Sequence, residues 1–313
     1  TGFDEISFLS LSAGDYSALR TLCSTTLDRC AEEQISLSLP SLRVGSIDDS
    51  IMDRMSSIRR TGMTLAPEAG SQRLRDVINK NITEEELLRA CGQMFSHGWS
   101  SVKLYFMLGL PTETDEDIRA IAELAERVVQ TWRMTAKNKM KGVRVTVSTS
   151  LFIPKPFTPF QWEPMCSMDE LRRKVSVLRG AIRSKSIVYH YHDPETSFLE
   201  GVFARGDRRL APVILEAWRN GCRLDAWDEQ FKFDVWMKAF ETCGIDPHTY
   251  VRERRLDELM PWFTIDCGVT DAYLKRSLAD AHAGKITLDC RAAESRCSGC
   301  GASRLLNGGK CNV

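Results

Sequence analysis

The sequence predicts an α/β fold in which parallel strands alternate with helices. Strand-like segments recur through the first half of the chain, helical stretches lie between them, and several strands carry polar residues on one face. Repeated strand–helix units imply a parallel sheet with right-handed crossovers. With 313 residues, the chain can bury a large core.

The clearest strand–loop–helix unit spans residues 102–132. Its strand places Lys103, Tyr105 and Met107 on one face and only apolar residues on the other, because successive side chains alternate. After a Gly-Pro turn, Thr114 and the acids that follow it can cap a helix with an apolar stripe. This unit therefore has its polar end at the carboxyl end of the strand.

Five strands are expected along the first half of the chain. They are residues 5–11, 35–39, 62–66, 101–108 and 144–150. Among the helices between them, residues 83–97 have the clearest pattern, since Thr83 and Glu86 form a capping box ahead of an apolar stripe.

Several of these strands alternate instead of being apolar throughout. Ser36 and Ser38, Thr64 and Glu68, and Thr146, Ser148 and Ser150 occupy the second face. A parallel strand that is buried on both sides should be a continuous apolar run. The alternation favours a curved, barrel-like sheet with helices outside and a polar, ligand-filled lumen. An open sheet with one solvated face is the alternative.

Polar loops follow all five strands. They span residues 12–16, 40–43, 67–71, 109–113 and 152–159. In barrels of parallel strands, the working residues lie on loops at the carboxyl ends of the strands. Glycine there allows a ligand to approach the backbone, and fixed carboxylates can bind it.

Composition limits the partners and the compartment. Forty-two basic residues balance 42 acidic ones, so binding to nucleic acid would need a local patch. The sequence has no apolar run of transmembrane length, which predicts a soluble, cytoplasmic protein without a membrane partner. Eleven cysteines indicate reduced thiols and metal ligation. Because Thr1 lies close to a strand, we expect a fragment whose natural start lies upstream.

The order SAGDY, APEAGS, GLPTET and FIPKPFTP, each after its strand, resembles strands two to six of the radical S-adenosylmethionine (SAM) enzymes. The closest likeness is to an uncharacterised branch that often carries an upstream cobalamin-binding domain. The resemblance implies a partial (βα)6 TIM-like barrel over residues 1–165. It also implies S-adenosylmethionine, a [4Fe-4S] cluster, and an electron donor such as flavodoxin or ferredoxin.

The same resemblance implies a set of cofactor-binding residues. They are Gly14, Asp15, Arg43, Glu68, Lys103, Gly109, Pro111 and Glu113. An acid suits an ammonium group or ribose hydroxyls, and glycine permits close approach of adenine. A dipole role for Glu113 at the helix start, and salt bridges of Lys103 and Arg43 to lumen acids, are the structural alternatives.

The family's cluster motif, CxxxCxxC, is absent from these residues. Cys23 and Cys30 are too far apart to replace it. We therefore expect the cluster ligands to lie upstream of Thr1 or to be lost, and the fragment alone to be inactive. With a cluster, the implied chemistry is a 5'-deoxyadenosyl radical that starts hydrogen abstraction or methyl or sulfur transfer on an unknown substrate.

Residues 166–285 are predicted to be mostly helical, with amphipathic helices over 169–183 and 208–220. His190 and His192 share a strand face and could bind a metal or move protons, although a third ligand is not evident. The arginines of residues 205–209 could bind an anion or form a solvated helix start. Four tryptophans are interpreted as core residues, namely Trp218, Trp227, Trp236 and Trp262.

The last segment, residues 286–313, is rich in cysteine. The predicted metal ligands are Cys290, Cys297, Cys300 and Cys311, which would bind zinc or an auxiliary iron–sulfur cluster. A disordered, reduced tail is the alternative, and Cys267 is a reserve ligand. A different class of function also stays open, a zinc-bearing RNA-binding module on an inactive barrel. An aldolase-like barrel is disfavoured because only Lys103 offers a lumen amine.

Overall fold

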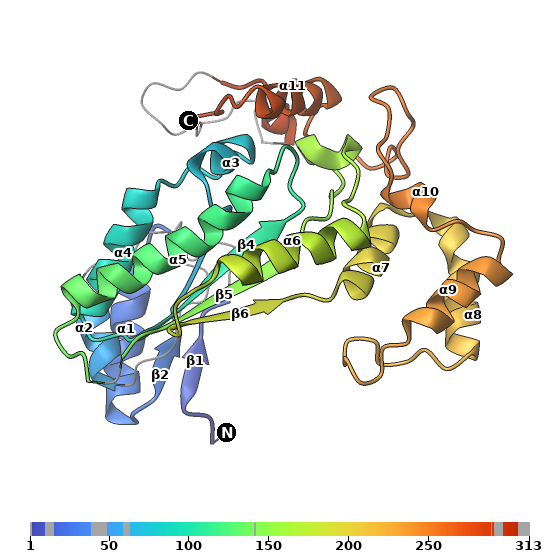
Figure 1. The fold of residues 1–313 in the computed structure, drawn as a ribbon. Coiled ribbons are helices and arrows are strands. Elements are labelled where there is room, and N and C mark those ends of the chain that lie inside the picture. The colour runs from blue at the N-terminus through green and yellow to red at the C-terminus, as the bar shows by residue number, and fades with distance from the viewer. Residues whose placement is uncertain are drawn as a thin grey trace. The chain divides into compact units, whose positions relative to one another are not determined.

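The computed structural model describes residues 2–9, 16–38, 49–58, 63–140, 142–288, 290 and 297–305. The chain forms two compact units. Figure 1 shows its helices and strands, coloured by residue number. Unit 1 comprises Thr1–Leu108, Glu113–Ser150 and Lys174–Tyr191. Unit 2 comprises Gly109–Thr112, Leu151–Arg173 and His192–Val313.

The described strands of unit 1 form two sheets. β1 (Glu5–Ser7) pairs in parallel with β2 (Ser36–Ser38). The second sheet has the order β3 (Met63–Glu68), β4 (Ser101–Leu108), β5 (Arg144–Leu151) and β6 (Ile187–Tyr191). The pairs β3–β4 and β5–β6 are parallel, so their carboxyl ends lie at the same edge of the sheet.

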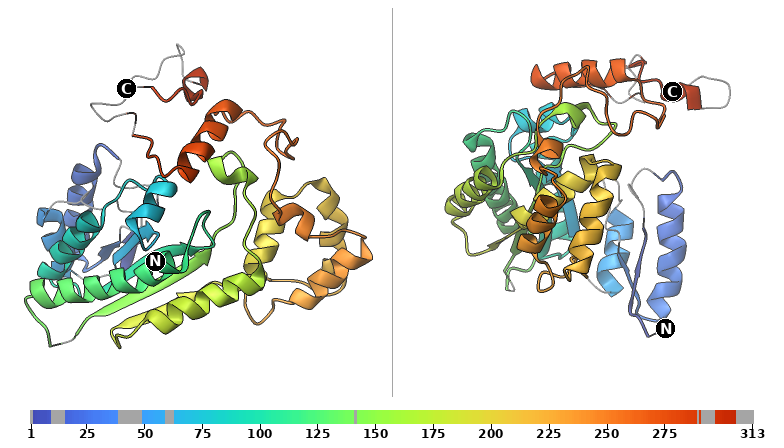
Figure 2. Two further views of the ribbon diagram at one scale, coloured as in Figure 1. Left: turned by 45° about the horizontal axis from the view of Figure 1, so that its top comes forward. Right: turned by 90° about the vertical axis from the view of Figure 1, so that its right-hand side faces the viewer.

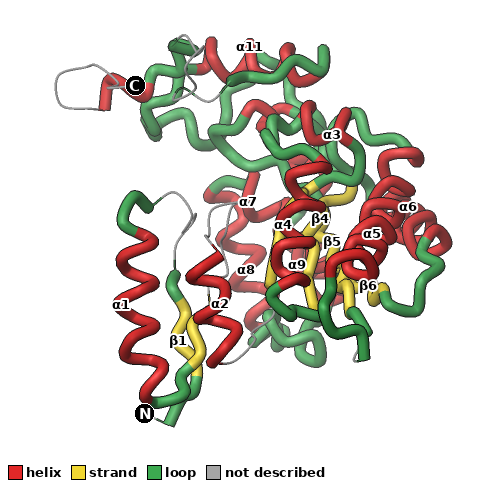
Figure 3. The backbone as a smooth tube through the Cα atoms, turned by 90° about the vertical axis from the view of Figure 1, so that its left-hand side faces the viewer, coloured by secondary structure: helices red, strands yellow, loops and turns green. Residues whose placement is uncertain are grey.

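Helices cover these sheets from one side. α1 (Leu19–Glu32) and α2 (Asp49–Ile58) contact each other and β2 (Figure 3). The next helices along the chain are α3 (Gln72–Val77), α4 (Glu84–Ser96), α5 (Asp115–Thr135) and α6 (Met168–Ala181). Only the second half of α6 belongs to unit 1. α4 and α5 lie side by side along the larger sheet (Figure 2).

The sequence explains why α4 and α5 begin where they do. Thr83 and Glu86 form a complete capping box at α4, and Thr114 and Asp117 form another at α5. Under α5, strand β4 buries every second side chain, from Val102 to Leu108, and leaves the alternate ones half-buried.

The α/β fold with parallel strands was predicted correctly. All five expected strands are present, although parts of their predicted ends, at residues 10, 11, 39 and 62, lie outside the described residues. β6 contains His190 of the expected His190–His192 strand face and extends the larger sheet beyond β5, but it ends at Tyr191, so His192 lies outside it. An open partial barrel is compatible with this arrangement, and the described strands do not close into a ring.

Unit 2 is built from short helices and loops. Its elements are η2 (Pro159–Trp162), α7 (Pro194–Arg205), η3 (Arg208–Leu210), α8 (Ala211–Arg219), α9 (Phe233–Thr242), α10 (His248–Val251), α11 (Asp271–His282) and η4 (Ala302–Leu305). α8 packs on α9, and α7 on α10. None of the helices in the described ranges has the length and apolar character needed to cross a membrane.

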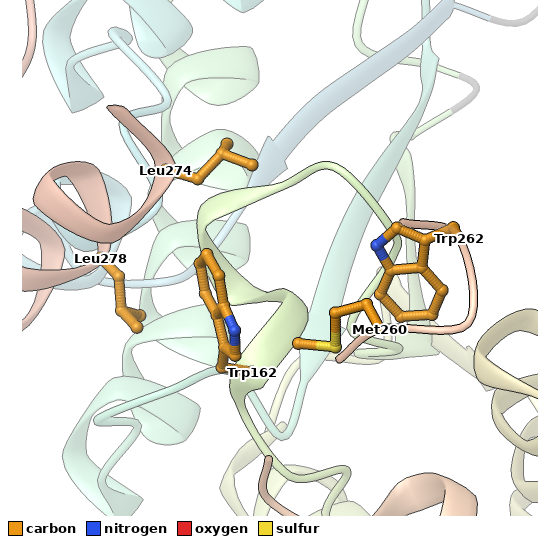
Figure 4. Packing of buried hydrophobic residues seen from close by; sticks show 5 residues of the cluster. All are labelled: Trp162, Met260, Trp262, Leu274 and Leu278. Atoms are coloured by element: carbon orange, nitrogen blue, oxygen red, sulfur yellow. The ribbon is translucent and has the colours of Figure 1, made fainter. Parts of the chain in front are cut away.

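A buried apolar cluster joins η2 to α11 within unit 2 (Figure 4). Its buried members are Trp162, Met260, Trp262, Leu274 and Leu278. The indole Nε1 of Trp262 donates to Gln161 Oε1 at 2.9 Å, so the polar edge of the ring is satisfied.

Arg205, at the end of α7, is fully buried and holds three backbone segments together. It donates to the carbonyls of Tyr250 at 2.8 Å, Glu163 at 2.7 Å and Arg252 at 2.9 Å. Burial, with smaller contributions from the neighbouring Arg254 and Arg252, lowers the pKa of its guanidinium to about 10. This arginine is therefore a structural centre of unit 2.

The prediction that four tryptophans lie in the core is half right. Trp236 and Trp262 are buried, whereas Trp218 and Trp227 are 51% and 64% exposed. Ile214 of α8, within the helix predicted over residues 208–220, is also exposed. Only Val213 and Ala217 of α8 are buried, so the apolar stripe of α8 is wider than the surface that α9 covers.

Candidate functional site

Glu68, the last residue of β3, has an unusual backbone. Its φ is +66°, and the N–H of Ala69 donates to the carbonyl of Pro67 at 2.8 Å, which makes a three-residue turn centred on Glu68. A left-handed conformation costs a residue with a β-carbon about 1–3 kcal/mol. Glycine would avoid this cost, so the carboxylate side chain is retained at an unfavourable backbone position.

The carboxylate of Glu68 has a defined but accessible position. Lys80 Nζ lies 3.2 Å from Glu68 Oε1. The side chain of Glu68 is 25% exposed and that of Lys80 is 37% exposed. The lysine fixes one carboxylate oxygen. A partly exposed carboxylate at a strand end can accept hydrogen bonds from hydroxyls of a ligand.

The loop behind Glu68 is held by a buried arginine and by a glycine. Arg75 is 2% exposed and donates through Nη1 to the carbonyls of Ala69 at 3.0 Å and Gly70 at 3.1 Å. Its burial lowers the pKa of the guanidinium. A β-carbon on Gly70 would lie 2.3 Å from the backbone N of Ile121, so only glycine allows α5 to approach this closely.

Asp117 joins the loop after β3 to the start of α5. Its side chain is 4% exposed and accepts hydrogen bonds from Ser71 Oγ, from Arg73, and from the N–H and hydroxyl of Thr114 at 2.8 and 2.9 Å. Burial acts against the charged carboxylate. The hydrogen bonds from Arg73, Ser71 and Thr114 outweigh burial and hold the pKa of Asp117 below its usual value.

The opposite face of the sheet from α5 carries half-buried polar and aromatic side chains. Lys103 Nζ lies 4.5 Å from the centre of the Tyr105 ring, a cation–π contact between neighbours on one strand face. Ser150 Oγ donates to the carbonyl of Phe106 at 3.5 Å. This face therefore has the mixed character that the alternating strands predict.

Glu113 forms a buried ion pair within unit 1. Its Oε2 lies 2.8 Å from Nζ of Lys174 on α6, and the two side chains are 1% and 8% exposed. The ion pair therefore holds Glu113, the residue before the N-cap of α5, in a structural role. Gly109 has a φ of +83° and lies in unit 2 with Pro111, where a β-carbon on Gly109 would lie 3.1 Å from Cβ of Cys166.

Three of the predicted cofactor-binding residues, Gly14, Asp15 and Arg43, lie outside the described residues. Glu68 and Lys103 are in unit 1. Sequence reasoning missed Arg75, Lys80 and Lys174, which have no distinguishing pattern in the chain. The sequence placed Asp117 among the acids that cap α5, but not in contact with Ser71 and Arg73 of the preceding loop.

The cysteines of the first half do not fit an iron–sulfur cluster. Cys23 and Cys30 are buried in α1, and Cys91 is buried in α4. Burial raises the pKa of Cys30, with a smaller contribution from Glu33, and raises that of Cys91 to about 12. The three thiols are packed inside two helices, and no three metal-ligating side chains of the described residues are arranged around a common point.

The other predicted clusters are either dispersed in the structure or lie partly outside the described residues. Over the described ranges, no three His, Cys, Asp or Glu side chains are arranged to hold a metal ion. Cys311 lies outside those ranges. In the predicted arginine patch, Arg205 is buried, and Arg209 is paired with Asp207 at 2.7 Å. Arg205 is therefore not available to an anion.

The fold and this strand-end geometry define an α/β protein of parallel strands with a rigid, acidic loop at one edge. Residues 5–125 match the family model of the Radical SAM superfamily, which includes β1 to β4 and the whole Glu68 loop. This match confirms the resemblance of that part of the chain to the superfamily, which the sequence motifs had indicated.

The chain is also similar to an uncharacterised protein of Methanocaldococcus jannaschii, with 29% identity over 242 residues. The alignment covers 77% of this chain and 50% of that protein, so the chain spans about half the length of this curated relative.

Two solved structures show weaker similarity. One is a sugar phosphate isomerase/epimerase from Parabacteroides distasonis, with 12% identity, coverage of 90% of this chain and 94% of that chain, and a TM-score of 0.34. The other is a dihydrodipicolinate synthase from Oceanobacillus iheyensis, with 10% identity, coverage of 90% and 97%, and a TM-score of 0.24.

Proposed function

We propose that unit 1 is the S-adenosylmethionine-binding part of a radical SAM enzyme, and that Glu68 binds the ribose hydroxyls of the cofactor. The superfamily match over residues 5–125 supports the choice of cofactor. A carboxylate accepts two hydroxyl hydrogen bonds well, and those bonds are stronger than bonds between neutral groups.

The observation that carries this proposal is the strained turn at Glu68. The chain keeps an acidic side chain at a φ of +66°, where glycine would be more stable. Arg75, Gly70 and Asp117 fix the surrounding loop, so the carboxylate is positioned before a ligand arrives. Such preorganisation lowers the entropy cost of binding.

The cluster is assigned to other residues in this proposal. Because the CxxxCxxC motif is absent from the sequence and the unit 1 cysteines are buried in helices, the [4Fe-4S] ligands would come from outside residues 1–313. With that cluster, S-adenosylmethionine supplies a 5'-deoxyadenosyl radical for hydrogen abstraction or for methyl or sulfur transfer. An electron donor such as flavodoxin or ferredoxin, and an upstream cobalamin domain, are further parts of the proposal. The chain alone would bind the cofactor without turning it over.

Calorimetric titration of the 313-residue chain with S-adenosylmethionine tests the role of Glu68. We expect Glu68→Gln to weaken binding about tenfold, which corresponds to about 1.4 kcal/mol. Glu123→Gln is the matched control, because Glu123 is an exposed carboxylate on α5 and its loss should leave Kd unchanged. Equal affinity of wild type and Glu68→Gln would contradict the proposal.

One observation favours the RNA-binding alternative. Trp218 and Trp227 are exposed, and Arg223 lies 5.2 Å from the Trp218 ring, an arrangement on which a base could stack. Filter binding of single-stranded RNA at 50 and 200 mM salt, with Trp218→Ala and Trp227→Ala, tests it. Salt-dependent binding that these variants abolish would support this function, and its absence would remove it.

A further inference from the structure

We propose that Cys297 and Cys300 form one half of a thiolate metal centre in unit 2, which binds zinc or iron. The two residues enclose Ser298 and Gly299 in a Cys-x2-Cys turn, a spacing that lets two sulfurs bind one ion. This inference concerns unit 2 alone and does not depend on S-adenosylmethionine binding.

Backbone N–H groups point at both sulfurs. The N–H of Gly299 donates to Cys297 Sγ at 3.4 Å, and the N–H of Ala302 donates to Cys300 Sγ at 3.5 Å. Each donor lies two residues after its cysteine, so the same local geometry occurs twice. Donors aimed at sulfur favour the negatively charged thiolate, which is the form that binds metals, and they tune the metal that is bound.

Two glycines permit this turn. Gly299 has a φ of +65° and Gly301 a φ of +99°, conformations that other residues adopt at a cost. A β-carbon on Gly301 would lie 2.7 Å from the carbonyl oxygen of Gly268. Gly301 is therefore needed both for the turn and for its close contact with the neighbouring segment.

The turn is also fixed to the rest of unit 2. The N–H of Thr270, at the cap of α11, donates to the carbonyl of Cys300 at 2.8 Å, and Arg276 of the same helix donates to the carbonyl of Ser298. A disordered, reduced tail would not require such contacts. They give the two sulfurs a defined position before a metal binds.

The turn supplies two ligands, and a tetrahedral site needs four. No third ligand is arranged around it among the described residues. Cys267 directly precedes Gly268, which contacts the turn, and Cys290 is exposed in the segment before it. These two thiols are the described candidates to complete the centre when the metal binds.

Metal content and cobalt titration of the full chain test the proposal. Purified without oxygen, the wild type should contain about one zinc or iron atom per chain, and elemental analysis distinguishes the two. Cys297→Ser and Cys300→Ser should lose this metal. Cys243→Ser, a partly exposed thiol of the same unit, is the matched control and should keep it.

Cobalt binding to the wild type adds a measurement that does not depend on how the variants fold. Co²⁺ added to metal-free wild type should give the intense near-ultraviolet absorption of thiolate-to-cobalt charge transfer, and Zn²⁺ should displace it. If Cys267 and Cys290 supply the remaining ligands, Cys267→Ser and Cys290→Ser should weaken this band. A band that neither variant changes assigns the remaining ligands to other residues and still supports Cys297 and Cys300 as two of the ligands. A wild type without metal and without the cobalt band, or a metal retained by Cys297→Ser, would overturn the proposal.

Discussion

Asp117, in the first turn of α5, accepts a hydrogen bond from Ser71, the N-cap residue of α3, with 2.5 Å between the two oxygens. The two residues are far apart in the chain, yet one carboxylate caps α5 and binds the cap of α3. This contact fixes the loop that carries Glu68 relative to the helix that covers the sheet.

Replacing Asp117 should make the stability of the protein less dependent on acid. A carboxylate whose folded-state pKa lies below its unfolded value of about 3.9 stabilises the fold above that pH, and this stability is lost as pH falls toward the folded-state pKa. Urea unfolding of wild type and Asp117→Asn at pH 7 and pH 3 measures the effect. We expect a smaller loss for the variant. An equal loss in both proteins would show that Asp117 does not carry this stabilisation.

Gly70→Ala should destabilise unit 1 by about 1–3 kcal/mol, because the added methyl group would overlap the backbone of α5. Gly180→Ala is the matched control. Gly180 lies in α6 with open space around it, so alanine there should stabilise the helix by about 0.5–1 kcal/mol. Thermal unfolding should therefore move in opposite directions for the two variants, and a shift of the same sign would contradict the close approach.

Glu68→Gly and Glu68→Ala should separate the backbone strain from the carboxylate. Both variants remove the side chain, but only glycine removes the left-handed cost, so Glu68→Gly should be about 1 kcal/mol more stable than Glu68→Ala. Both should bind S-adenosylmethionine more weakly than wild type. Equal stability of the two variants in denaturant would mean that the turn is not strained.

The ion pair of Glu113 and Lys174 should behave as a buried pair. Glu113→Leu or Lys174→Met alone would leave an uncompensated charge and cost about 3–5 kcal/mol. The double variant should recover most of that loss, since apolar side chains of similar size can replace a buried pair at little cost. A double-mutant cycle of unfolding free energies tests this. Purely additive losses would show that the two side chains do not interact.

Local rules predicted the elements of unit 1 well. The capping box at Thr83 and the alternation of β4 act within a few residues, so the sequence shows them directly. A strand at His190 was expected from the sequence, but its place in the larger sheet was not, because that place depends on pairing with β5.

The candidate site was only partly predictable. Glu68 was identified through the motif around it, but Lys80 and Arg75 were not, since their roles depend on how the chain turns after the strand. Trp218 and Trp227 show the converse error, because an aromatic residue at helical spacing can be exposed when no neighbouring element covers it.

Hydrogen exchange of the full chain with and without S-adenosylmethionine tests most directly whether the loop after β3 holds the cofactor. The amides of Ala66 and of residues 68–71 should exchange more slowly when the cofactor is added, while those of α8 should be unaffected. Binding that leaves residues 66–71 unprotected, with slower exchange confined to unit 2, would contradict the assignment of the site to Glu68 and its loop.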